Sequence, residues 1–224
     1  MIDSVKVVGV TTPTIPELTS PSNMVAYIAR VSNPANQFNT LTASKLLRYL
    51  VKHKHWSPFE MVNIVMEINT TRDIGRQILR HRSFTFQEFS QRYANPTTLG
   101  FETREARLQD EKNRQNSIEI DTNNEQQRLL AIEWERAQKR VLFAVQKEYD
   151  WAIANGIAKE QARAVLPEGL TASRMYMNGT LRSWIHFIQV RSGNGTQKEH
   201  MLIAREVAKI IAEIFPLAEQ FVTE

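Results

Sequence analysis

Residues 61–82 have the sequence MVNIVMEINTTRDIGRQILRHR, and the change of pattern within this stretch decides the fold class. Its first half alternates apolar with mostly polar side chains, which predicts a strand over Met61–Asn69 with one buried face. That face consists of Val62, Ile64, Met66 and Ile68. The second half places Ile74, Ile78 and Leu79 at helical spacing, which predicts a helix over Thr71–Arg82 with basic residues in its last turn.

The same two kinds of pattern predict further elements on both sides of this stretch. Strands are expected at Val5–Val10, Phe84–Tyr93 and Thr171–Asn178. Helices are expected from a cap at Ser22 or Asn23 through Ala29, from Thr40 or Thr42 through Leu50, and over Glu125–Ala154, Leu181–Arg191 and Lys198–Phe215. The polar, aperiodic segment 103–124 is expected to be a mobile surface loop or a lid.

Taken together, these elements predict an α/β (α+β) fold with a single domain over residues 1–224. A central, mostly antiparallel sheet should be packed by helices. One of them is the long amphipathic helix Glu125–Ala154, in which Leu130, Trp134 and Val141 recur at helical spacing.

The composition excludes several classes of protein. The chain contains no cysteine, so disulfides, zinc–thiolate sites, iron–sulfur clusters and cysteine nucleophiles are all excluded. No stretch approaches the ~20 consecutive apolar residues of a membrane span, and the first residues lack the pattern of a signal peptide. We therefore expect a cytoplasmic protein without a membrane partner. The net charge of +4 slightly favours anionic ligands but does not separate nucleotides from nucleic acids.

The segment Arg80–Tyr93 holds the densest group of polar residues that could bind a ligand or take part in catalysis. If Phe84–Tyr93 is extended, Glu88, Ser90 and Arg92 point to the same side, because strand side chains alternate. Arginine is the natural bidentate partner of a phosphate, so this face could hold a phosphorylated ligand. The alternative is that the basic residues only complement the dipole at the end of the helix.

The residues of this segment resemble the signature of the flavin-dependent thymidylate synthases. That signature is Arg-His-Arg, seven residues, Ser, and then Arg-Tyr, and it matches Arg80-His81-Arg82, Ser90 and Arg92-Tyr93, with Glu88 matching between them. Thr85 and Gln87 stand where the family more often has Ser and Asn. Three further blocks resemble the same family in the right order: His55–Glu60, Gln161–Pro167, and Asn178–Arg182 followed by His186, Arg191 and Gln197–His200.

The resemblance implies the reductive methylation of dUMP to dTMP in a homotetramer with shared active sites. FAD would be the hydride and one-carbon carrier, methylene-tetrahydrofolate the carbon donor and NADPH the reductant. The residues that would bind dUMP are Gln77, Arg80, Glu88, Ser90, Arg92, Arg163 and Arg191. The residues that would line FAD are Ser32, Ser57, Glu60, Arg80, His81, Arg82, Glu88, Arg182 and His186.

Local physics is consistent with these assignments. Gln77 and Arg80 are one helical turn apart, and Arg182 and His186 are at i and i+4, so each pair should share a face. Because there is no cysteine, activation of the uracil ring must be electrostatic, and Arg191 is the candidate catalytic residue. Ser90 has no evident base and is assigned to substrate binding.

Three other interpretations remain open or are set aside at this stage. A basic nucleic-acid-binding module would use the arginines together with Phe84, Phe86 and Phe89, although we expect no nucleic-acid partner. Another nucleotide-directed flavoenzyme would bind FAD without making dTMP. His53 and His55 lack a third ligand, so no metal site is expected.

Overall fold

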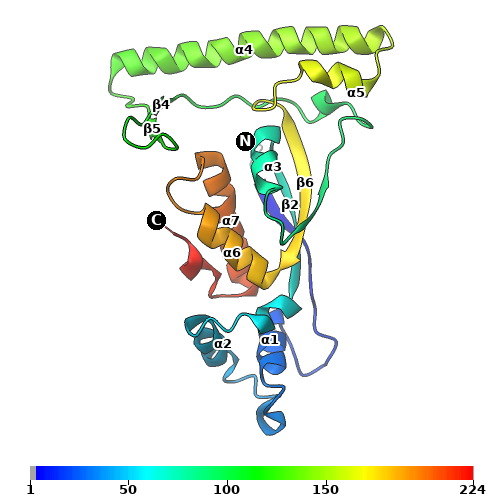
Figure 1. Cartoon of the computed structure of the whole chain (residues 1–224), viewed down its shortest axis with the longest axis vertical. Coiled ribbons are helices and arrows are strands. Elements are labelled where there is room, and N and C mark those ends of the chain that lie inside the picture. The colour runs from blue at the N-terminus through cyan, green and yellow to red at the C-terminus, as the bar shows by residue number, and fades with distance from the viewer. Residues whose placement is uncertain (1–3, 224) are drawn as a thin grey trace.

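The computed structural model describes residues 4–223, and its centre is a four-stranded antiparallel sheet (Figure 1). In spatial order the strands are β1 (Ser4–Val10), β2 (Asn63–Thr71), β6 (Ala172–Thr180) and β3 (Thr85–Glu88). A separate hairpin is formed by β4 (Arg107–Gln109) and β5 (Ser117–Glu119). The predicted α+β class with a mostly antiparallel sheet is therefore confirmed.

The alternation that predicted the central strand corresponds to its burial. Ile64, Met66 and Ile68 are fully buried on β2. The antiparallel register places Met66 opposite Met177 and Ile68 opposite Met175 on β6. Directly opposed residues lie on the same face of a sheet, so the two strands together present one apolar surface to the helices.

The helices in chain order are α1 (Pro21–Ala29), α2 (Ala43–Lys52), α3 (Arg72–Ile78), α4 (Glu125–Ala154), α5 (Lys159–Ala162), α6 (Leu181–Arg191) and α7 (Lys198–Ile214). Short 3-10 turns are η1 (Pro34–Asn36), η2 (Ser57–Met61), η3 (Pro96–Thr98), η4 (Arg163–Val165) and η5 (Ala218–Phe221). The main core lies between the sheet and helices α6 and α7, which contribute Trp184, Phe187, Ile188, Ile203, Val207 and Ile211.

A glycine in β6 lets the segment before β3 pack against the sheet. A Cβ atom at Gly179 would lie 2.4 Å from Cδ1 of Phe84, which is closer than real contacts allow. The ring of Phe84 instead sits over Gly179 and meets Trp184 edge-on at a centroid distance of 4.7 Å. Phe84 is thus a buried core residue and is not available to stack on a nucleic-acid base.

The helix and the strand predicted on either side of the Arg-His-Arg signature were both too long. The helix expected over Thr71–Arg82 ends at Ile78 and continues as tighter turns, with Arg80 N donating to Gln77 O and His81 N to Ile78 O. The strand expected over Phe84–Tyr93 ends at Glu88, and Ser90 opens a turn by accepting from Tyr93 N. Glu88, Ser90 and Arg92 therefore do not share one strand face, because the chain leaves the sheet after pairing with β6.

The other predicted elements differ little from the structure. The strand expected at Thr171–Asn178 extends to Thr180, the helices expected at Glu125–Ala154 and Leu181–Arg191 have those bounds, and the last helix ends one residue early at Ile214. The cap of α1 was predicted wrongly. Ser20 caps this helix by accepting from Asn23 N, and Pro21 takes the first helical position, where its missing N–H is not needed.

Helix α4 lies across one end of the molecule, beyond the end of the sheet (Figure 1). Its C-terminal half packs against α5 and η4 through a small cluster of Tyr149, Ala152 and Ala162, separate from the main core. Segment 103–124, expected to be a mobile surface loop or a lid, contains the β4–β5 hairpin, which the aperiodic sequence had not indicated. Among residues 4–223, no helix has the length and apolar character needed to cross a membrane.

Candidate active site

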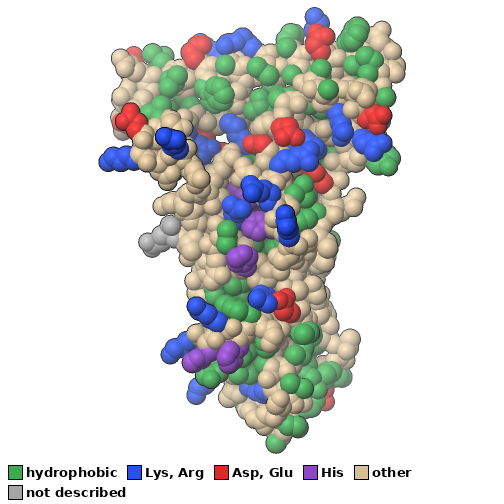
Figure 2. Space-filling view, viewed as in Figure 1, with side chains coloured by type: hydrophobic (Ala, Val, Ile, Leu, Met, Phe, Trp, Pro, Cys, Tyr) green, Lys and Arg blue, Asp and Glu red, His purple; other side chains and the backbone are tan. Residues whose placement is uncertain are grey.

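Basic and histidine side chains gather in the middle of one face, in the region of α3 and α6 (Figure 2). Arg191, the last residue of α6, donates from Nε to Nε2 of His81 at 2.9 Å. The two Nη groups of Arg191 make no hydrogen bond to any residue between 4 and 223, which leaves the planar end of the guanidinium for a ligand. Arg80 is exposed and close enough to influence the charge of Arg191.

The environment of His81 keeps its imidazole neutral. Burial, together with the positive charge of Arg191 and the neighbouring His186, lowers the pKa of His81 to about 4. A neutral ring can accept the hydrogen bond from Arg191, whereas an imidazolium could not. Burial and, as a smaller cause, the nearby positive charge of Arg80 also lower the pKa of Arg191, and no ion pair joins either arginine to an acidic residue between 4 and 223. This junction should attract an anion.

Gln77 lies at the same junction and is held by two residues of the α7 entry that sequence reasoning did not assign. Its Nε2 donates to Oε1 of Gln197 at 2.7 Å, and its Oε1 lies 3.3 Å from Nδ1 of His200. His200 is fully buried, and its ring faces that of His81 edge-on at 6.2 Å. Both residues occur in the quoted block Gln197–His200, but nothing local in that block indicates contact with a residue 120 positions away.

A second group of residues predicted to bind the nucleotide lies around Glu160 on α5. Arg92 Nε lies 3.2 Å from Oε2 of Glu160, and Arg163 Nε donates to the backbone oxygen of the same residue at 3.2 Å. The hydroxyl of Ser90 accepts from Arg92 N at 3.4 Å. Between residues 4 and 223, no hydrogen bond or ion pair joins this group to that of Gln77, His81 and Arg191.

Glu88 is engaged elsewhere, between β3 and the start of α3. Its Oε1 accepts from the hydroxyl of Ser173 at 3.0 Å and lies 3.5 Å from Nη1 of Arg72. The side chains of Arg72 and Glu88 are 10% and 17% exposed, so the pair is largely shielded from water. This arrangement fixes the carboxylate against the sheet, and sequence analysis had not included Arg72 in the site.

A third group lines a pocket of about 400 Å³ between η2 and α6. Its lining is Trp56, Glu60, Ser83, Arg182, Ser183, Ile185, His186 and Gln189. Arg182 and His186 share a face, as their spacing predicted. Glu60 accepts from Thr180 Oγ1 and from Arg182 Nη1, each at 2.7 Å, and these contacts lower the pKa of its carboxyl despite some burial.

Six residues predicted near the flavin lie outside the lining of this pocket, namely Ser32, Ser57, Arg82 and the already described Arg80, His81 and Glu88. Ser57 is the exposed first residue of η2, three positions before Glu60. Ser32 is exposed in the turn after α1, and Arg82 is exposed in the turn before Phe84. The part of the chain from 4 to 223 holds no cluster of three or more His, Asp or Glu side chains suited to a metal ion.

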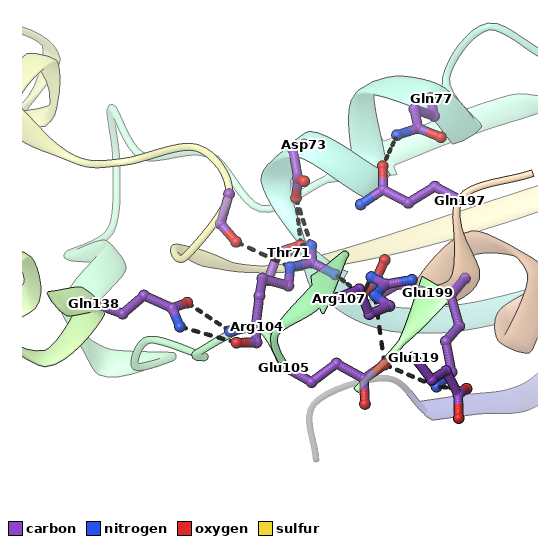
Figure 3. Close-up of polar contacts among 12 residues, drawn as sticks. Thr71, Asp73, Gln77, Arg104, Glu105, Arg107, Glu119, Gln138, Gln197 and Glu199 are labelled. Carbon is purple, nitrogen blue, oxygen red and sulfur yellow. Dashed lines mark hydrogen bonds and ion pairs between the residues drawn. The ribbon is translucent and has the colours of Figure 1, made fainter. Parts of the chain in front are cut away.

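A buried ionic cluster beside the site was not anticipated (Figure 3). Glu199 Oε1 contacts Nη2 of Arg107 and lies 3.2 Å from Nη1 of Arg104. Arg104 also reaches Asp73 at the start of α3, at 2.8 Å. Burial alone would raise the pKa of Glu199, but its backbone hydrogen bond and the two guanidinium groups outweigh that effect and lower it. The sequence of this segment carries no periodic signal from which these contacts could be found.

The fold and these groups define an α+β protein whose sheet and helices present arginine clusters suited to phosphorylated ligands. A family model described as "Thymidylate synthase complementing protein" matches residues 15–217. The chain belongs to this family.

Two relatives span nearly the same length. The chain is 45% identical over 214 residues to a probable flavin-dependent thymidylate synthase of Paramecium bursaria Chlorella virus 1, covering 95% of each chain. It is 48% identical over 200 residues to a flavin-dependent thymidylate synthase of Synechocystis sp., covering 88% of this chain and 87% of the relative.

The fold is also similar to that of a solved structure, the UMP/dUMP methylase PolB from Streptomyces cacaoi bound with 5-Br dUMP. The TM-score is 0.75 at 24% identity, covering 97% of this chain and 93% of the other.

Proposed function

We propose that the protein catalyses the reductive methylation of dUMP to dTMP. The observation that carries this proposal is the neutral His81 held against Arg191 beside Arg80, in a chain of this family. No ion pair joins these guanidinium groups to an acidic residue within 4–223, so they suit a phosphate or the negative charge that develops on a uracil ring. In this proposal residues 1–224 work as one domain, in the cytoplasm that the cysteine-free sequence suits.

The protein's own contribution to the reaction is electrostatic. The chain contains no cysteine, so no thiolate can attack the uracil ring. Arg191 is the catalytic residue in this proposal, because its Nε is fixed by His81 while its Nη groups stay available to stabilise negative charge. Among residues 4–223, the hydroxyl of Ser90 hydrogen-bonds only to the backbone N–H of Arg92, and no base lies beside it, so we assign Ser90 to nucleotide binding.

The pocket lined by Glu60, Arg182 and His186 fits part of a flavin nucleotide. A guanidinium and an imidazole one helical turn apart can meet a phosphate or a planar ring, and the pocket volume of about 400 Å³ suits a portion of such a ligand. When bound, FAD would supply the hydride, methylene-tetrahydrofolate the one-carbon unit and NADPH the reducing equivalents. Glu60 holds Arg182 in place through its 2.7 Å contact.

The residues predicted to bind dUMP lie in two separate groups, which supports a site shared between copies of the chain. Arg92 and Arg163 gather around Glu160, whereas Gln77 and Arg191 gather at α3 and α6. A single nucleotide could meet both groups if they come from different subunits. Helix α4 also exposes Phe143 and Trp151, which a homotetramer would cover.

The deciding experiment measures dTMP formation from dUMP by the purified protein with FAD, NADPH and methylene-tetrahydrofolate, omitting one component at a time. We expect product only with the complete mixture. Bound FAD without product would indicate a flavoenzyme with another nucleotide substrate. Absence of both, with salt-dependent binding to long polyanions, would overturn the proposal in favour of nucleic-acid binding.

Two variants test the assigned roles. Arg191→Ala should lower turnover roughly 100- to 1,000-fold, because it removes a preorganised charge from the transition state. Arg136→Ala on the exposed face of α4 is the matched control and should leave turnover unchanged. Ser90→Ala should weaken dUMP binding yet retain measurable turnover, and its complete inactivation with intact binding would contradict the binding role.

A further inference from the structure

The amide of Gln77 is held at both of its polar atoms by residues at the start of α7. Nε2 donates to Gln197, the residue that precedes the helix, and Oε1 meets Nδ1 of His200, its third residue. Figure 3 shows the bond from Gln77 to Gln197 beside the ionic cluster. Gln77 is only partly buried, so one N–H and one lone pair of its amide remain for a ligand.

The orientation of this amide depends on which nitrogen of His200 carries the proton. Burial, with the charge of Arg191 and the neighbouring His81, lowers the pKa of His200 to about 3, so the ring is neutral and has one N–H. Gln77 Oε1 can only accept, so Nδ1 must be the donor in this arrangement. The opposite tautomer would require the amide to turn over, together with its partner Gln197.

Burial favours the tautomer with the proton on Nδ1. Nε2 of His200 is buried and has no hydrogen-bond partner among residues 4–223. An N–H group left there without an acceptor would be a rare and costly feature, whereas an unpaired lone pair is better tolerated. The surroundings of His200 therefore select one orientation of the Gln77 amide.

The turn that carries Gln197 and His200 is itself anchored. Glu199, between them, is held by Arg104 and Arg107 from the segment that enters the hairpin. Lys198 lies 2.8 Å from Glu105 and 2.5 Å from Glu119, on either side of the hairpin. These contacts, of which Figure 3 shows those among Arg104, Arg107 and Glu199, reduce the freedom of the first turn of α7. His200 can therefore impose its geometry on Gln77.

We infer that His200 is a positioning residue, which fixes the Gln77 amide in the orientation that the nucleotide meets. This inference rests on the proposed function, which assigns Gln77 to dUMP. His200 acts through Gln77 and does not itself touch the substrate. Its removal should therefore change nucleotide affinity much more than the rate of the chemical step.

The test compares two substitutions of His200. His200→Leu introduces an apolar side chain of similar size and removes the donor, whereas His200→Asn places an amide N–H close to the position of Nδ1. We expect His200→Leu to raise the KM and Kd for dUMP about tenfold with little change in kcat. His200→Asn should restore most of that affinity, and His53→Leu, at an exposed histidine after α2, should behave as the wild type.

Two results would overturn the inference. One is a His200→Leu protein with unchanged dUMP affinity, or a His200→Asn protein that binds dUMP no better than His200→Leu when circular dichroism shows that both are folded. The other is a nitrogen NMR spectrum that places the proton of His200 on Nε2 in the wild-type protein. A wild-type protein that binds no dUMP would instead overturn the proposed function, and the NMR result would still decide how the amide is oriented.

Discussion

Helices α6 and α4 both carry tryptophan at amphipathic spacing, yet the fold uses them in different ways. Trp184 of α6 is 0% exposed, and its Nε1 donates to Ile64 O at 3.1 Å in the centre of the core. Trp151 of α4 is 57% exposed. A similar periodicity thus produces a core helix in one place and a helix with an open apolar face in the other.

The two regions also differ in what holds them. The sheet with α6 and α7 is stabilised by contiguous apolar burial. Helix α4 is attached through a small apolar cluster and hydrogen bonds, and the hairpin is attached through ion pairs. The side chain of Gln138 on α4 forms two hydrogen bonds with the backbone of Arg104: Oε1 accepts from Arg104 N at 2.7 Å, and Nε2 donates to Arg104 O at 2.9 Å. The free energy gained from apolar burial scales with the buried area, whereas a polar attachment depends on a few individual hydrogen bonds and ion pairs. The two regions should therefore respond differently to substitution.

The largest difference is expected between the two tryptophans. Trp184→Ala should lower the free energy of unfolding by about 4 kcal/mol, because it opens a cavity in the core. Trp151→Ala should change the stability of the folded chain by less than about 0.5 kcal/mol. Urea unfolding at one protein concentration measures both, and sedimentation would report whether Trp151 lies between copies. Equal losses from the two substitutions would remove the distinction between the regions.

The next effect concerns the ionic attachment of the hairpin. Glu199→Gln should cost about 3 kcal/mol, because it removes the buried carboxylate that Arg104 and Arg107 share. Hydrogen exchange should then accelerate in segment 105–119 while β2 and β6 stay protected. Glu213→Gln, at an exposed position of the same helix, is the control. Faster exchange in the sheet as well would mean that the two regions unfold together.

A smaller effect is expected when the pH is lowered: the free energy of unfolding should fall because of two histidines in the core region. The pKa of His200 is about 3 in the folded chain, against 6.5 for the unperturbed group, so between these values only the unfolded state takes up its proton. Stability is thus complete above pH 6.5 and falls as the pH decreases, by about 2 kcal/mol between pH 6.5 and 5. His81, with a pKa of about 4, adds a loss of the same sign. His200→Leu should flatten the pH dependence of urea unfolding, and a profile identical to the wild type would contradict this account.

The smallest effect is expected on the outer face of α4. Lys139 and Glu135 form an i,i+4 ion pair at 2.6 Å, but both side chains are exposed. Water screens such pairs, so Lys139→Ala should leave the thermal unfolding midpoint unchanged within error. A clear decrease would indicate that this face of α4 is covered in the assembled protein.

Sequence reasoning succeeded where the signal was local. The alternation in β2, the spacing in α6 and the Asn155-Gly156 stop of α4 each depend on neighbouring residues, and their bounds were predicted to within two residues. The signature residues were also found by their order along the chain. The end of α3 at Ile78 was missed because the chain must turn there to pair β3 with β6, which is a long-range requirement.

The sequence by itself determined most of the elements, the absence of thiol chemistry and the residue types that a phosphorylated ligand needs. Only the tertiary structure decided which of two similar apolar faces is buried, that Arg92 and Arg163 lie apart from Arg191, and that His200 holds Gln77. The physical reason is one of range. Periodicity and capping act over a few residues, whereas burial and hydrogen-bond partners depend on which distant segments pack together.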